Sequence, residues 1–273
     1  MSAVAAPLST TKATMITKVC LDVLEFVTLV FFVVEHAART FTVRGAMITV
    51  LVVIGSSAEA AGRVVTFRAD DGRTLSGLLI EADQRPAPAV VLVPMLGRPK
   101  DDWQAVAQRF ADSNITALAI DLPGTNIPED PKELVRWSED IRAAVAYLVS
   151  RPADVRAGSI GVAGASLGGS LAVLEAAGDA TVRAIALISP SLDYRGVRIE
   201  APIRAYGARP ALLVASARDP YAARSARELA QDAKGPRDIR WSEVAGHGTV
   251  LLSRDPDLAR SLVEWFQGTL GVN

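Results

Sequence analysis

The chain has 273 residues, 50% hydrophobic and 22% charged, so it can bury a large core and does not have the composition of a disordered protein. This length fits one large domain, or one domain with an N-terminal appendage. The formal net charge of −1 gives no reason to expect nucleic acid or an anionic membrane as a partner, and the single cysteine, Cys20, excludes an intramolecular disulfide.

The first 60 residues differ in pattern from the rest of the chain. They contain two apolar runs and lack the turn residues that punctuate the later sequence. The first run, residues 19–34, is interrupted by Asp22 and Glu25. Charged side chains within such a run make it a poor membrane span.

The second run, residues 46–54, has the layout of a secretory signal peptide. It follows Arg39 and Arg44 and precedes small residues that end in an A-x-A site at Ala60. We therefore expect a signal peptide near residues 43–60 and export of residues 61–273, either to the periplasm or as a secreted protein. Residues 1–42 are then expected to be a start-site artefact. The alternative is an uncleaved apolar segment, residues 1–60, that anchors the domain to a membrane.

From residue 62 onward, strand-like and helix-like patterns alternate. Strands are expected where apolar residues alternate or form short unbroken runs, and helices where they recur every three or four residues. The expected strands are Arg63–Arg68, Thr74–Ile80, 89–93, Thr116–Ile120, 159–163, Val182–Ile188, 211–215 and 239–244. The first expected helix is capped by Asp101 or Asp102 and has Trp103 and Phe110 on its apolar face. A long helix is expected along the apolar stripe Leu134, Trp137, Ile141, Val145 and Leu148. Two more are expected over 167–177 and 221–233, and the apolar residues of a last helix are Leu258, Leu262, Trp265 and Phe266.

This order of elements predicts the α/β class. We expect a mainly parallel sheet covered by helices on both faces and led by an antiparallel hairpin, whose turn is Asp70-Asp71-Gly72. No internal repeat or low-complexity linker follows residue 62, so residues 61–273 are expected to form one domain. Residues 190–210 separate two of the strands and are too few for a large lid, which predicts an open site.

The segment Gly164-Ala165-Ser166-Leu167-Gly168 fits the pattern G-x-S-x-G between an expected strand and an expected helix. A nucleophilic serine in such a turn stands above the sheet, and glycines two residues to either side remove β-carbons that would clash. The free N–H groups at the start of the helix also point towards it. The sequence predicts Ser166 as a nucleophile. The other interpretation is a glycine-rich turn that only caps a helix.

A serine hydroxyl is a poor nucleophile until a base takes its proton. His247 lies between two glycines after the last expected strand, where core packing does not require a histidine. The only other histidine, His36, precedes the expected domain. His247 is therefore the predicted base, and a structural or surface role is the alternative.

The base needs a carboxylate that fixes its tautomer and stabilises the imidazolium. Asp219 follows the expected strand 211–215, although with Pro220 it would also make an ordinary helix N-cap. Asp193, after the preceding strand, is the competitor. We favour Asp219 because its loop is expected at the sheet edge where the loops of Ser166 and His247 converge.

The negative charge that develops on the substrate carbonyl requires an oxyanion hole. The backbone N–H of Leu167 is one expected donor. The other is expected from residues 94–98, and Pro94 has no N–H, so Leu96 is the first choice and Met95 the second.

Together these motifs resemble the α/β-hydrolase superfamily, and most closely its compact esterases and dienelactone-hydrolase-like members. The matching pieces are residues 93–97, 121–124 and 164–169, the segment around Asp219, and residues 246–248. The resemblance implies Ser166, Asp219 and His247 as a catalytic triad, with Leu96 and Leu167 as oxyanion donors. Because these groups suffice for an acyl-enzyme reaction, we expect no metal and no organic cofactor.

Two departures from the family pattern bear on the substrate. Many relatives have a histidine where this chain has Pro94-Met95, and dienelactone hydrolases use a cysteine nucleophile where residue 166 is serine. A dienelactone substrate is therefore not implied. Three arginines between residues 190 and 210 could meet an anionic substrate, although solvated surface charges are the simpler interpretation: Arg195, Arg198 and Arg204.

The sequence thus predicts a serine hydrolase that cleaves a small carboxylic ester through an acyl-enzyme, without a cofactor. One alternative is a peptidase or amidase that uses the same triad. Others are a non-catalytic binding protein of this fold, and a scaffold anchored through residues 1–60. The sequence carries no prediction of oligomeric state.

Overall fold

The computed structural model describes residues 62–124, 127–232 and 234–272. The expected signal peptide near residues 43–60 and the whole segment 1–60 lie outside the described residues. In the described part of the chain, no helix is both long enough and apolar enough to cross a lipid bilayer.

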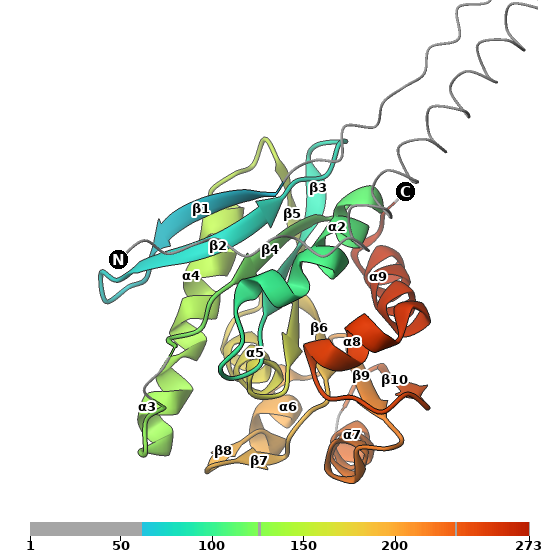
Figure 1. The fold of residues 1–273 in the computed structure, drawn as a ribbon. Helices are drawn as coiled ribbons and strands as arrows, with labels where there is room; N and C mark the ends of the chain where they lie inside the picture. The colour runs from blue at the N-terminus through green and yellow to red at the C-terminus, as the bar shows by residue number, and fades with distance from the viewer. Residues whose placement is uncertain (1–61, 125–126, 233, 273) are drawn as a thin grey trace, which may run out of the picture. The chain divides into compact units, whose positions relative to one another are not determined.

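One large sheet forms the centre of the described chain (Figure 1). Its eight strands lie in the order β1-β2-β4-β3-β5-β6-β9-β10. Strand β2 pairs antiparallel with both β1 and β4, and the other neighbours are parallel. The bounds are β1 Arg63–Arg68, β2 Thr74–Ile80, β3 Ala87–Val93, β4 Thr116–Ile120, β5 Val155–Ala165, β6 Val182–Ile188, β9 Ala211–Ser216 and β10 Arg237–Ser242. The predicted mainly parallel sheet with a leading hairpin is confirmed.

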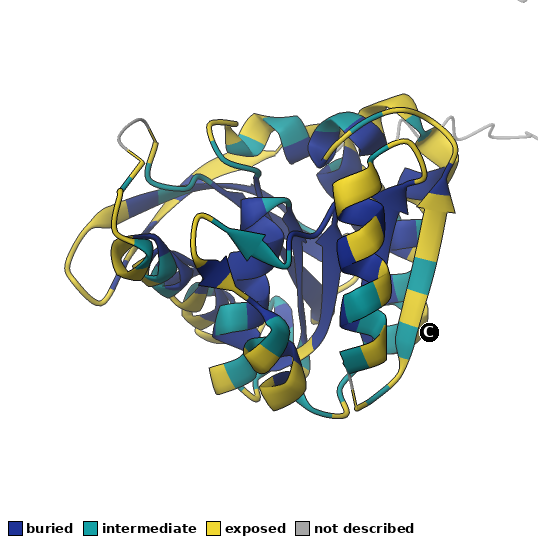
Figure 2. Cartoon of the chain, turned by 90° about the horizontal axis from the view of Figure 1, so that it is seen from below, coloured by how far each residue is buried: buried dark blue, intermediate teal, exposed yellow. Residues whose placement is uncertain are grey.

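Helices cover both faces of this sheet. They are η1 Lys100–Trp103, α2 Gln104–Asp112, α3 Pro131–Arg136, α4 Ser138–Val149, α5 Leu167–Gly178, α6 Glu200–Tyr206, α7 Pro220–Asp232, α8 Thr249–Arg254 and α9 Pro256–Leu270. Neighbouring strand residues point to opposite faces, so Val91 packs in a cluster with α3 to α7 and Val90 in a cluster with α2, α8 and α9. Figure 2 shows the resulting layers, with buried strands between helices whose outer surfaces are exposed.

The long helix expected along Leu134, Trp137 and Ile141 is two helices, α3 and α4. They meet at Trp137, whose N–H donates to Leu134 O, and Asp140 N–H donates to Trp137 O. Both bonds reach back three residues, so the backbone tightens into a 3₁₀-type turn between the helices. The apolar stripe continues across this turn because all three predicted side chains stay buried. The sequence pattern therefore did not reveal the break.

The predicted helix cap at Asp101 or Asp102 is wrong. A short 3₁₀ helix, η1, precedes α2, and neither aspartate caps them. The N–H of Lys100 donates to Asp121 Oδ1, 2.9 Å away, so a carboxylate at the end of β4 takes the capping role. Asp102 instead pairs with Arg98 and accepts a hydrogen bond from Thr249 Oγ1.

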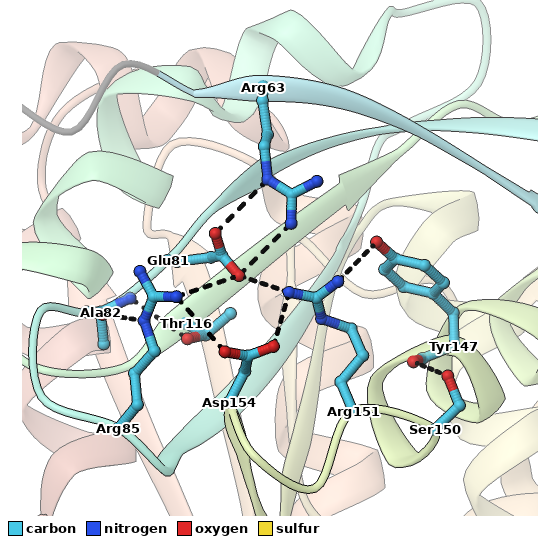
Figure 3. Close-up of polar contacts among 9 residues, drawn as sticks. All are labelled: Arg63, Glu81, Ala82, Arg85, Thr116, Tyr147, Ser150, Arg151 and Asp154. Atoms are coloured by element: carbon cyan, nitrogen blue, oxygen red, sulfur yellow. Dashed lines mark hydrogen bonds and ion pairs between the residues drawn. The ribbon is translucent and has the colours of Figure 1, made fainter.

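A network of ion pairs ties the leading hairpin to the turn before β5 (Figure 3). Glu81 accepts from Arg151 at 2.6 Å and from Arg63 at 3.4 Å, and Asp154 accepts from Arg151 at 2.7 Å and from Arg85 at 3.3 Å. Arg85 lies two residues before β3, and Asp154 directly precedes β5. The network therefore lies at the amino ends of the parallel strands.

The chain between β6 and β9 forms a small excursion. It holds a two-stranded hairpin, β7 Asp193–Tyr194 and β8 Val197–Arg198, followed by α6. Arg195 and Gly196 between the two strands have φ of 50° and 85°, as a tight type I′ turn requires. The sequence pattern predicted no elements here, but the excursion agrees with the expectation that this segment holds no large lid.

Candidate active site

Ser166 occupies the sharp turn between β5 and α5. Its backbone has φ 50° and ψ −119°, which a residue with a β-carbon adopts only at a cost of about 1–3 kcal/mol. The N–H of Ser166 donates to Ile188 O at 2.8 Å, so the turn is held against the end of β6. Its side chain is half-buried. A strained, anchored turn thus presents the Ser166 hydroxyl at the carboxyl edge of the sheet.

The glycines around Ser166 allow the backbone to close up at this turn. A β-carbon on Gly164 would lie 2.2 Å from Gly168 O, and one on Gly168 would lie 2.4 Å from Pro94 O. All these neighbours are backbone atoms, which cannot rotate away. The two glycines are therefore required for the start of α5 to approach both β5 and the loop after β3.

His247 lies between Ser166 and Asp219. Its Nε2 is 2.9 Å from Ser166 Oγ and its Nδ1 is 2.5 Å from Asp219 Oδ2. With the ring proton on Nδ1, the histidine donates to the carboxylate and accepts from the serine hydroxyl. The His247 side chain is 45% exposed and that of Asp219 is 18% exposed, so solvent and small molecules can reach the histidine. The structure brings the three predicted residues into one hydrogen-bonded chain.

The two candidate acids have different partners. Asp219 faces His247, whereas Asp193 accepts from Gly196 N–H at 2.7 Å and from Arg198 Nε at 2.8 Å. The ion pair with Arg198, together with the Gly196 bond, lowers the pKa of Asp193. Asp219 also caps α7, because its Oδ1 accepts from Ala222 N–H at 3.1 Å. Asp219 therefore caps α7 and also contacts His247. Its role as the catalytic acid stays a prediction.

The loop after β3 packs beside the nucleophile turn. Pro94 O approaches Gly168, and Arg98 N–H donates to Met95 O at 3.1 Å, which closes a turn over the intervening residues. Leu167 is the first residue of α5, where a helix leaves its N–H groups without an intrahelical acceptor. Among the described residues, the N–H of Leu96 also has no hydrogen-bond partner. Both N–H groups are thus free to bind an oxyanion, and this role stays a prediction.

Two contacts that the sequence analysis missed hold the loop of His247. Gly248 N–H donates to Ser189 Oγ at 2.9 Å, and Thr249 Oγ1 donates to Asp102 Oδ2 at 3.1 Å. Their partners are 59 and 147 residues away in the chain, so no local pattern signals them. A small polar residue after a strand, like Ser189, is common in loops of every kind.

The three arginines of the excursion do not converge on the triad. Arg198 pairs with Asp193 and Arg204 pairs with Asp232, while Arg195 lies exposed in the hairpin turn. This placement supports the interpretation of these side chains as surface charges. Across residues 62–124, 127–232 and 234–272, no group of three or more His, Cys, Asp or Glu side chains is arranged to hold a metal ion.

Comparisons with known proteins agree with this arrangement. A model described as "Alpha/beta hydrolase family" matches residues 90–269. A carboxymethylenebutenolidase from Pseudomonas putida is 25% identical over 206 residues, which cover 67% of this chain and 84% of that protein.

Solved structures show the same fold. The dienelactone hydrolase from Anabaena variabilis superposes with a TM-score of 0.66 at 17% identity, over 77% of this chain and 99% of that one. The esterase domain of a Rhodothermus marinus protein superposes with a TM-score of 0.63 at 20% identity, with the same coverage of 77% and 99%.

Proposed function

Because this chain belongs to the alpha/beta hydrolase family, we propose that it hydrolyses a carboxylic ester through an acyl-enzyme on Ser166, with His247 as base and Asp219 as acid. The observation that carries the proposal is the continuous chain of 2.9 Å and 2.5 Å contacts from Ser166 through His247 to Asp219. A buried core histidine has no need of such an arrangement, whereas proton transfer from a serine hydroxyl requires it.

In the first half of the reaction, Ser166 Oγ attacks the ester carbonyl and its proton passes to Nε2 of His247. Asp219 stabilises the imidazolium that forms. The carbonyl oxygen becomes an oxyanion, which the N–H groups of Leu96 and Leu167 would bind. When the tetrahedral intermediate collapses, the bond to the alcohol oxygen breaks and His247 gives that oxygen the proton. The products are a free alcohol and an acyl group on Ser166.

In the second half, water replaces the alcohol. The oxygen of a water molecule attacks the acyl carbon while Nε2 of His247 takes a proton from that water. The second tetrahedral intermediate forms and then collapses. The acid leaves and the proton returns to Ser166 Oγ. Every proton is moved by His247, so this mechanism needs neither a metal nor an organic cofactor.

An ester is a better candidate substrate than an amide. The names of the similar proteins, a carboxymethylenebutenolidase and an esterase domain, refer to ester and lactone chemistry. The half-exposed His247 and the absence of a large insertion in the β6–β9 connection favour small acyl substrates. An amidase activity on the same triad remains the second candidate.

Hydrolysis of p-nitrophenyl acetate and butyrate by the full chain tests this function. We expect turnover by the parent and a loss of at least about 10³-fold in kcat for Ser166→Ala, because no other group replaces the nucleophile. The matched control is Ser170→Ala, one turn later in α5, whose buried hydroxyl has no hydrogen-bond partner among the residues that the structure describes. Equal turnover by Ser166→Ala and the parent would contradict the proposal.

A further inference from the structure

Ser189 is the residue that directly follows β6, and its backbone is strained. It is fully buried, and its φ of 52° is one that residues with a β-carbon rarely adopt. A glycine would take this conformation with less strain, but it would have no hydroxyl. The position therefore combines an unfavourable backbone with a buried polar side chain.

The dipeptide Ile188-Ser189 bonds to all three elements that carry the candidate triad. Ile188 O accepts from Ser166 N–H at 2.8 Å, and Ser189 N–H donates to Val214 O at 2.7 Å in β9, the strand that leads to Asp219. Ser189 Oγ accepts from Gly248 N–H at 2.9 Å, next to His247. The end of β6 is thus the point where the nucleophile turn, the acid strand and the histidine loop are joined.

The Gly248 end of this junction has little freedom. Its φ is 56°, and a β-carbon there would lie 2.6 Å from Met95 Sδ and 3.5 Å from Ala165 Cβ. Gly248 is buried, so its N–H has no access to bulk water as an alternative acceptor. Loss of the Ser189 hydroxyl would leave this N–H unpaired, and the loop would have to shift to satisfy it.

We propose that Ser189 is a positioning residue, whose hydroxyl holds the backbone of Gly248 and thereby aims His247 at Ser166 and Asp219. This proposal rests on the proposed function, because it assigns Ser189 to the support of that site. Ser189 touches neither the substrate nor the reacting atoms. It acts only through the place it gives to His247.

The test compares Ser189→Ala and Ser189→Gly with the parent. Both variants remove the hydroxyl, and the glycine variant also relieves the strained φ, so it is expected to fold with nearly the parental melting temperature. We expect kcat to fall by about 10- to 100-fold through misplacement of His247, with KM changed by less than about twofold. The matched control is Ser191→Ala, which removes a buried hydroxyl bonded to Tyr221 OH at 3.2 Å, outside the junction, and should keep parental kcat.

Two further measurements separate positioning from general destabilisation. In a His247→Ala background, Ser189→Gly should leave the residual rate unchanged, because the residue through which it acts is gone. The low-field proton resonance of the His247 Nδ1–H, assigned by its absence in His247→Ala, should shift or broaden in Ser189→Gly without any substrate present.

Parental kcat and an unchanged proton resonance in Ser189→Gly would overturn the proposal, as would an equal loss of rate in the His247→Ala background. The resonance also separates this proposal from the proposed function. A parent that hydrolyses no ester would contradict the function, whereas the response of the resonance to Ser189→Gly would still decide whether Ser189 positions His247.

Discussion

The carboxylate of Asp219 uses its two oxygens for different partners. Oδ1 accepts from Ala222 N–H at the start of α7, and Oδ2 faces Nδ1 of His247. The helix therefore fixes the carboxylate, and the carboxylate in turn fixes the tautomer of the imidazole. An amide at this position has one acceptor oxygen, so if it keeps the cap on the helix it presents an N–H₂ group to the histidine.

Asp219→Asn is accordingly expected to separate catalysis from folding. We expect kcat to fall by about 10³- to 10⁴-fold, because the imidazole loses its charged partner and its tautomer. The midpoint of urea unfolding should stay close to that of the parent. Asp193→Asn is the matched control, since Asp193 is bonded to Arg198 and Gly196 rather than to His247, and it should keep parental kcat. A similar loss in both variants, or in neither, would show that Asp219 is not the acid.

Asp255 links the last two helices to β10 and gives a pH-dependent contribution to stability. Its Oδ1 caps α9 by accepting from Leu258 N–H at 3.0 Å, and its Oδ2 accepts from Ser242 Oγ at 2.5 Å. The hydrogen bond from Ser242, with that from Leu258, lowers the pKa of Asp255 in the folded protein. Because the folded pKa lies below the unfolded one, this stability is present above the unfolded pKa and is lost as pH falls through the folded pKa.

Asp255→Ala should therefore lower the free energy of unfolding by about 1–2 kcal/mol near neutral pH, and the difference from the parent should shrink between about pH 5 and pH 2. Urea unfolding at a series of pH values measures this difference. Asp257→Ala, which removes an 86% exposed side chain from the same helix turn, should cost less than about 0.5 kcal/mol at every pH. A difference for Asp255→Ala that does not change with pH would contradict the assignment.

At the scale of elements, the sequence predicted what depends on local pattern and missed what depends on distant partners. The fully buried strands β3 and β4 were recognisable because unbroken apolar runs are what a sheet covered on both faces requires. The break between α3 and α4 at Trp137 was not recognisable, because the stripe of buried apolar side chains continues through it. The capping role of Asp121 and the bond from Thr249 to Asp102 were hidden for another reason: each bond joins residues that are far apart in the sequence.

The network at Glu81 shows how the leading hairpin is joined to the rest of the sheet. Arg151 bonds Glu81 and Asp154 at 2.6 Å and 2.7 Å and lies over the ring of Tyr147. These three charged side chains are partly buried, with 15% to 25% of each exposed. Such charge-assisted bonds contribute more than exposed pairs, since removal of one partner leaves a partly desolvated charge.

Arg151→Met keeps the aliphatic stem and removes the charge. We expect it to lower the free energy of unfolding by about 1–3 kcal/mol and to leave kcat unchanged, because the network lies at the amino ends of β3 and β5 and the candidate triad at the carboxyl ends. Arg204→Met is the control: both members of its pair with Asp232 are at least 40% exposed, so it should cost less than about 0.5 kcal/mol. Equal costs for the two variants, in urea unfolding, would contradict the special role of the network.

At the scale of the whole molecule, the fold places three distant segments at one edge of the sheet. Ser166 follows β5, Asp219 follows β9 and His247 follows β10, and parallel strands direct all three loops to their common carboxyl edge. This is why the order serine, acid, histidine in the sequence was enough to predict which side chains meet. The role of the Ser189 hydroxyl could not be predicted in the same way. It depends on the positive φ of Ser189 and on Gly248, which lies 59 residues away in the sequence.

The proposed function requires Ser166 to be an activated nucleophile in the folded protein. Reaction of the full chain with a fluorophosphonate probe, followed by intact mass measurement, tests it without knowledge of the substrate. We expect one covalent adduct on the parent and on Ser170→Ala, and none on Ser166→Ala or, at the same exposure time, on His247→Ala. A folded parent that forms no adduct, or an adduct that persists in Ser166→Ala, would contradict the claim.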